Sequence, residues 1–105
     1  EGQGRGVAHA LRQDHAMREA EVEKHFCWPV EMAGGKTWKF TSPSHRGVAD
    51  RIAVLPGGRV WFVELKTPGG RLSKLQERFA EDCKRLKLNY TVLWTKEQVD
   101  QWLKF

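Results

Sequence analysis

A glutamate and a lysine interrupt the most apolar stretch of this 105-residue sequence. The run Trp61-Phe62-Val63-Glu64-Leu65-Lys66 is typical of a β-strand, in which alternate side chains face opposite ways, so Glu64 and Lys66 share one face. Burying an unpaired charge is costly, so these two charges must pair with each other, reach solvent or hold an ion. We interpret this strand end as a candidate site. The alternative is that both residues only keep an edge strand soluble.

A second candidate strand, Arg51–Leu55, brings another carboxylate to the same place. Asp50 precedes this strand and Pro56-Gly57-Gly58 follows it, which is typical of an antiparallel hairpin with a three-residue loop. In that register Asp50 lies opposite Glu64, with Cβ atoms about 5 Å apart. A two-residue loop would shift the register by one and turn Asp50 to the other face.

Two carboxylates at that distance repel each other, and a divalent cation relieves the repulsion. Oxygen ligands of this kind suit Mg²⁺ or Mn²⁺. The sequence therefore predicts a metal site at Asp50 and Glu64, unless Asp50 is only a turn residue.

The order of these residues resembles the signature of the PD-(D/E)XK nucleases. The signature begins with Gly47-Val48-Ala49-Asp50 and continues after the hairpin with Glu64-Leu65-Lys66. With Gly70-Arg71-Leu72-Ser73 and Gln76 added, the string is similar to the VRR-NUC family, the virus-type replication-repair nucleases, in its small stand-alone phage-type form. The similarity runs from about residue 17 to the C-terminus. It departs from the superfamily pattern at residue 49, where alanine replaces proline.

This resemblance implies a metal-dependent endodeoxyribonuclease that hydrolyses phosphodiester bonds. Asp50 and Glu64 would bind Mg²⁺ or Mn²⁺ directly, with the backbone carbonyl of Leu65 as a further ligand. Lys66 would orient or activate the attacking water and stabilise the developing charge.

The resemblance also implies two further site residues. Enzymes of this superfamily carry a glutamate on the first helix, three residues before an apolar position, and Glu19 stands in that relation to Val22. Glu23, one turn further on, is the alternative metal ligand, although both could simply be solvated acids of a first helical turn. Gln76 would lie at the margin of the active site, where its amide could hold a water or a phosphate.

The basic composition suits a polyanionic partner, because the formal net charge is +5. Stand-alone members of this branch resemble Holliday-junction resolvases, which act as dimers because two symmetric cuts need two active sites. We therefore expect branched or junction DNA as the substrate and a homodimer as the active form. A broader flap or nicking nuclease, or a non-catalytic DNA-binding module, is the alternative. The candidate DNA contacts are Ser42, Arg46, Arg71, Ser73 and Lys74. Trp28 and Trp102 could form a dimer face, although we expect both in the core.

The elements that must position these residues form an α/β domain. Apolar periodicity and turn residues predict strands at about 36–40, 51–55, 60–66 and 90–94, and helices at about 18–33, 73–86 and 95–103. In the helix that begins at Ser73, the predicted inward residues are Leu75, Phe79, Cys83 and Leu86. The order agrees with the αβββαβ core that the resemblance implies, with an extra C-terminal helix and a four-stranded mixed sheet flanked by helices.

The length suits one domain, which we expect over residues 17–105, with residues 1–16 a leader or tag remnant outside the fold. No apolar run is long enough to span a bilayer, so we expect no membrane contact and a cytoplasmic location, in a bacterial host if a phage encodes the chain. The loop after Lys66 lacks the Gly-Lys-Ser/Thr of a phosphate-binding loop, so no nucleotide cofactor is expected. Cys27 and Cys83 are isolated and should be reduced thiols.

Overall fold

The structure is a computed structural model that describes residues 20–41 and 47–104. An N-terminal helix covers residues 20–32. The strands are β1 (Lys36–Lys39), β2 (Arg51–Leu55), β3 (Arg59–Leu65) and β4 (Tyr90–Leu93), and the later helices are α2 (Lys74–Arg85) and α3 (Lys96–Leu103). The predicted leader and Glu19 lie outside the described residues.

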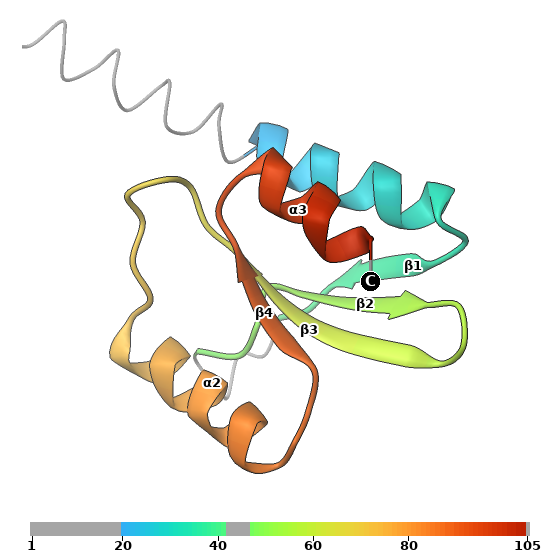
Figure 1. Cartoon of the computed structure of the whole chain (residues 1–105). Coiled ribbons are helices and arrows are strands. Elements are labelled where there is room, and N and C mark those ends of the chain that lie inside the picture. Colours follow the sequence, from blue (N-terminus) through green and yellow to red (C-terminus); the bar gives the residue numbers. More distant parts are fainter. Residues whose placement is uncertain (1–19, 42–46, 105) are drawn as a thin grey trace, which may run out of the picture.

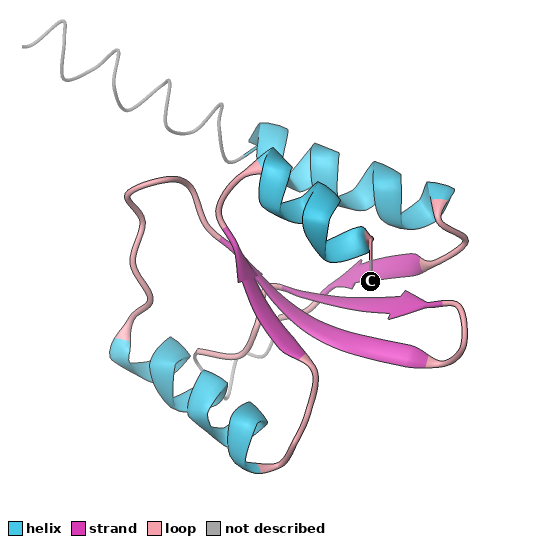
Figure 2. Cartoon of the chain, viewed as in Figure 1, coloured by secondary structure: helices cyan, strands magenta, loops and turns pink. Residues whose placement is uncertain are grey.

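The four strands form one mixed sheet in the order β1-β2-β3-β4. Neighbours among the first three strands are antiparallel, whereas β4 is parallel to β3, and α2 makes the crossover between them. A parallel pair needs such a long connection, so the helix follows from the topology. Figure 2 shows the strands together in the sheet and the helices outside it. The predicted α/β class and order of elements are confirmed. Within the described residues, no helix is long and apolar enough to cross a membrane.

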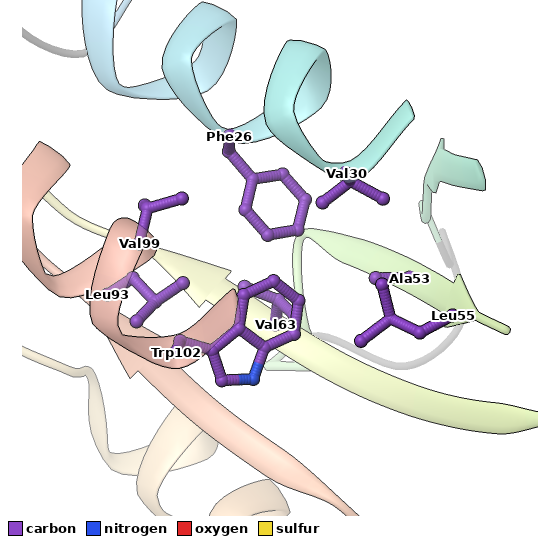
Figure 3. Packing of buried hydrophobic residues seen from close by; sticks show 8 residues of the cluster. All are labelled: Phe26, Val30, Ala53, Leu55, Val63, Leu93, Val99 and Trp102. Carbon is purple, nitrogen blue, oxygen red and sulfur yellow. The ribbon is translucent and has the colours of Figure 1, made fainter. Parts of the chain in front are cut away.

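Helices cover both faces of the sheet (Figure 1). The N-terminal helix and α3 lie on one face and α2 lies on the other. The main core lies between the sheet and the N-terminal helix and α3. It consists of Phe26, Val30, Ala53, Leu55, Val63, Leu93, Val99 and Trp102 (Figure 3). Its two largest rings, Phe26 and Trp102, stack with centroids 5.4 Å apart. This packing fixes the N-terminal helix on the sheet.

A second apolar layer of aromatic rings lies between the sheet and α2. Phe62 of β3 makes edge-to-face contacts with Phe40 and with Phe79 of α2, with ring centroids 6.5 and 5.7 Å apart. Phe79 in turn makes an edge-to-face contact with Tyr90 of β4, with ring centroids 5.9 Å apart. Edge-to-face contacts of this kind are favourable beyond the area that they bury. The layer lies on the strand face that also carries Glu64, as the alternation of side chains predicts.

The orientation of α2 differs from the prediction. Leu75 and Leu86 are 44% and 56% exposed, so their inward placement was wrong. The half-buried and buried positions of the helix include Gln76, Phe79 and Cys83, which follow one another at helical spacing. Leu75 lies one residue earlier and therefore about 100° around the helix, which turns its side chain away from the sheet.

Trp28 is also outside the core. It is 65% exposed because Phe26 and Val30, two residues to either side, face the sheet and are fully buried. Trp102 is 7% exposed and is a core residue, as predicted. Cys27 and Cys83 are free thiols, as predicted.

Candidate active site

The β2–β3 hairpin has the register that the sequence predicted. The loop is the three-residue turn Pro56-Gly57-Gly58, and the pairing of β2 with β3 ends at Arg51 opposite Val63. Gly57 and Gly58 have φ values of +88° and +73°, which favour glycine. One step further along the same ladder are Asp50 and Glu64.

Backbone hydrogen bonds hold Asp50 in place from two sides. The N–H of Leu65 donates to Asp50 Oδ2 at 3.2 Å. The N–H of Phe40 donates to the Asp50 carbonyl at 2.7 Å. These contacts hold Asp50 beside the end of β3, which contains Glu64 and is followed directly by Lys66.

Glu64 is a buried carboxyl group with an unsatisfied oxygen. Its side chain is 1% exposed, and Oε2 accepts a hydrogen bond from Gln76 Nε2 at 3.4 Å. Within the part of the chain that the structure describes, Oε1 is buried without a partner. A buried polar atom without a partner is rare in folded proteins and marks a place where a ligand can bind.

The environment of Glu64 favours its neutral form. Burial, followed by the neighbouring Asp50 carboxyl group, raises the pKa of Glu64 from 4.5 to about 9, and Lys66 opposes this shift. Glu64 is therefore protonated at neutral pH when no cation is present. A cation at the pair would reverse that preference, since it stabilises the carboxylate.

Tyr90 is a second buried polar group on this face of the sheet. Its hydroxyl oxygen has no partner among the described residues. Burial and then the nearby Glu64 carboxyl group raise the pKa of Tyr90 to about 12, so the phenol stays neutral. The sequence shows Tyr90 only as a strand residue, and nothing in its spacing indicates this position.

Gln76 joins the start of α2 to Glu64. Its Oε1 accepts from the Ser73 N–H at 2.8 Å, while its own N–H donates to Ser73 Oγ at 3.1 Å. This is a capping box, and the Ser-x-x-Gln spacing in the sequence is its signature. The remaining amide nitrogen donates to Glu64, so Gln76 lies beside this carboxyl group, and its role in holding a water or a phosphate stays a prediction.

Gly47 sets how closely the loop before Asp50 approaches α2. Its φ is +90°, and a Cβ added there would lie 2.5 Å from the carbonyl carbon and oxygen of Leu75. Only glycine fits this contact. The sequence motif includes Gly47, but the approach of a loop to a helix 28 residues later is visible only in the structure.

A pocket of about 240 Å³ opens beside the carboxylate pair. Its lining consists of Val22, Glu23, Lys39, Asp50, Arg51, Leu65 and Lys66. The N-terminal helix and the three antiparallel strands, or the residues next to them, thus all contribute to one concave site. Asp50, Leu65 and Lys66, which the sequence predicted as neighbours, come together here.

Glu23, the alternative metal ligand, is held by an arginine. Arg51 Nη1 donates to Glu23 Oε1 at 2.7 Å, and Arg51 Nε donates to Thr37 Oγ1 at 3.1 Å. The Arg51 side chain is only 11% exposed, so this ion pair ties the N-terminal helix to β1 and β2. Sequence reasoning missed the pair, because two residues 28 positions apart give no local signal.

The predicted DNA contacts differ in their surroundings. Arg71 and Lys74 are exposed. Ser73 caps α2 through its hydroxyl oxygen, which leaves its O–H as a donor. Ser42 and Arg46 lie outside the described residues.

The donor set fits a hard divalent cation in part. Asp50 and Glu64 supply carboxylate oxygens, and Glu64 Oε1 lacks any other partner in the described chain. Within residues 20–41 and 47–104, no group of three His, Cys, Asp or Glu side chains is placed to hold a metal ion. Waters, the Leu65 carbonyl or residues beyond this part of the chain would therefore have to complete the coordination.

Comparison with known proteins finds similarity in both sequence and structure. No family model matches the chain. A protein of Acyrthosiphon pisum secondary endosymbiont phage 1, described as "Putative nuclease p44", is 40% identical over 77 residues, which are 73% of this chain and 81% of that protein. A solved structure described as a VRR_NUC domain has a TM-score of 0.78 and 28% sequence identity, and the match covers 83% of this chain and 95% of that one.

Fold and sequence therefore lead to the same class. The mixed sheet flanked by helices, with two carboxyl groups and a lysine at a hairpin end, is the arrangement of a PD-(D/E)XK nuclease. Within that class, the chain belongs to the VRR-NUC family.

Proposed function

We propose that this nuclease is a Mg²⁺- or Mn²⁺-dependent endonuclease that hydrolyses phosphodiester bonds of branched DNA, with Holliday junctions as the preferred substrate. The observation that carries the proposal is the buried Glu64 carboxyl group beside Asp50, with one oxygen left without a partner. A protein that only binds DNA gains nothing from two adjacent carboxyl groups at this place, because carboxyl groups do not attract phosphate.

The proposed ligands are Asp50, Glu64, the Leu65 carbonyl and Glu19, with Glu23 as the alternative to Glu19. Because Glu23 already pairs with Arg51, we favour Glu19. A divalent cation bound by these groups supplies Lewis acidity and neutralises charge on the phosphate.

The other roles belong to the side chains around the pair. Lys66 would orient the attacking water and stabilise the developing negative charge. Gln76 would keep the Glu64 carboxyl group oriented, because its amide already donates to Oε2. The aromatic layer under α2 would exclude bulk water from that face, which strengthens electrostatic interactions there.

Selectivity for junctions requires a second copy of the active site. We propose a homodimer, in which two sites make symmetric cuts. The exposed Trp28 is available for such an interface, unlike the buried Trp102.

The test is to incubate the protein with labelled four-way junction, flap and linear duplex DNA in Mg²⁺, Mn²⁺ or EDTA. Glu64→Gln is the matched control, because it keeps the shape of the side chain and removes its charge. Metal-dependent cutting that the control lacks would support the nuclease, and paired symmetric cuts in the junction would support the dimeric resolvase. Cutting of flaps or nicking of duplexes alone would favour the broader nuclease.

Binding without cutting in any metal would favour the non-catalytic module. A second measurement distinguishes the metal-dependent nuclease from the non-catalytic module. Mg²⁺ or Mn²⁺ should raise the melting temperature of the wild type and not of Glu64→Gln, because only the wild type offers the carboxylate pair.

A further inference from the structure

Lys39 is a basic residue at the pocket that the predicted DNA contacts do not include. It is the last residue of β1, it is exposed, and it pairs with Arg51, the residue after Asp50. It lines the pocket together with Asp50 and Lys66. Lys39 therefore lies next to the proposed reaction site.

The cations of this pocket differ in their partners. Arg51 is neutralised by Glu23 at 2.7 Å. Lys66 directly follows β3 and lowers the pKa of the Glu64 carboxyl group, against the larger effect of burial. Within residues 20–41 and 47–104, the Lys39 side chain forms none of the ion pairs. Lys39 is exposed and lines the pocket, so its ammonium group can reach an anionic ligand there.

We propose that Lys39 binds a backbone phosphate of the DNA strand that crosses the pocket, on the side of the N-terminal helix. The proposal rests on the proposed function, because it takes DNA as the ligand. Along β1, Lys39 shares a face with Thr37, whose hydroxyl accepts from Arg51 below the N-terminal helix. The expected contacts Arg71 and Lys74 lie at the start of α2, which covers the other face of the sheet. The DNA strand would then be bound on both sides of the carboxylate pair.

The chain offers a matched control in Lys36. It is exposed, lies on the same strand and carries the same charge. It pairs with Val54 and lines a different pocket, beside the turn Pro56-Gly57-Gly58. The two lysines are three positions apart, which is about 10 Å along a strand and places them on opposite faces. Both substitutions change the net charge equally, so only local contact distinguishes them.

The experiment measures binding of fluorescein-labelled duplex and four-way junction DNA in EDTA, from about 50 to about 200 mM salt. Lys39→Ala should weaken binding about eightfold near 0.1 M salt and reduce the slope of log K against log salt by about 0.9, the effect of one lost phosphate contact. Lys36→Ala should leave the slope unchanged, and Lys39→Arg should restore it. In cleavage assays, Lys39→Ala should raise KM without changing kcat at saturating DNA.

Equal effects of Lys39→Ala and Lys36→Ala would overturn the proposal, because they would reflect net charge alone. An unchanged slope for Lys39→Ala would overturn it as well. Because binding is measured without metal, a protein that binds through Lys39 but never cuts would refute the proposed nuclease activity and leave this inference standing. A wild type that does not bind DNA at all would refute both.

Discussion

Replacing Glu64 by glutamine should make the metal-free protein more stable at neutral and alkaline pH. In the folded protein the pKa of Glu64 is about 9, whereas its ordinary value is 4.5. At pH values between 4.5 and about 9, the Glu64 side chain is deprotonated in the unfolded chain and protonated in the folded chain. The free energy of unfolding therefore falls as pH rises, and the contribution of Glu64 is fully present only below the lower value.

The size of this effect follows from the linkage relation. One proton difference changes the free energy of unfolding by about 1.4 kcal/mol per pH unit. From about pH 5.5 to about pH 7.5 the wild type should lose roughly 2 to 3 kcal/mol that Glu64→Gln keeps. For a domain of this size the difference in Tm between the two proteins should grow by on the order of 10 °C.

Thermal unfolding in EDTA across this pH range measures the effect. Glutamine mimics the protonated side chain and can still accept from Gln76, so the Tm values of the two proteins should differ least at the acidic end of the range. Glu81→Gln, on the exposed side of α2, is the control and should follow the wild type. If the curves of wild type and Glu64→Gln stay parallel, the burial argument for Glu64 is wrong.

Three further predictions concern other residues of the site. Lys66→Ala should abolish cleavage and change DNA affinity less than tenfold; cutting at the wild-type rate would exclude Lys66 from the chemistry. Gly47→Ala should cost about 3 kcal/mol or more in chemical denaturation, because a strained φ adds to overpacking, whereas Gly57→Ala, with a similar φ and open space, should cost about 1 to 2 kcal/mol. Equal costs at the two glycines would contradict the close contact with α2. Gln76→Glu should keep the helix cap and Tm but slow cleavage, because it replaces the donor to Glu64 by a second carboxylate; an unchanged rate would show that the donor is dispensable.

Local patterns were sufficient to predict the hairpin and the carboxylate pair. Alternation fixes which strand residues share a face. The residues Pro56-Gly57-Gly58 indicate a short loop, and the convergence of Asp50 with Glu64 favoured the three-residue loop that the structure has. The Ser73 cap was readable for the same reason, since its partner lies one turn away.

Contacts between distant elements were not predictable in this way. The rotation of α2, which exposes Leu75 and turns Gln76 inward, depends on how the helix packs on the aromatic layer of the sheet. The exposure of Trp28 depends on which face of the N-terminal helix meets that sheet. Likewise, the Arg51–Glu23 ion pair forms only after both elements have packed.

The hairpin register also limits how the length of this chain can vary. Because the two carboxyl groups face each other through the pairing of β2 with β3, one residue inserted into or deleted from either strand alone would separate them, whereas a change in the turn would not. Paired changes that lengthen or shorten both strands together would keep them opposite each other. Relatives that retain the site should therefore keep β2 and β3 matched in length between the two carboxyl groups, and differ in the length of this segment in the turn or by equal changes in both strands.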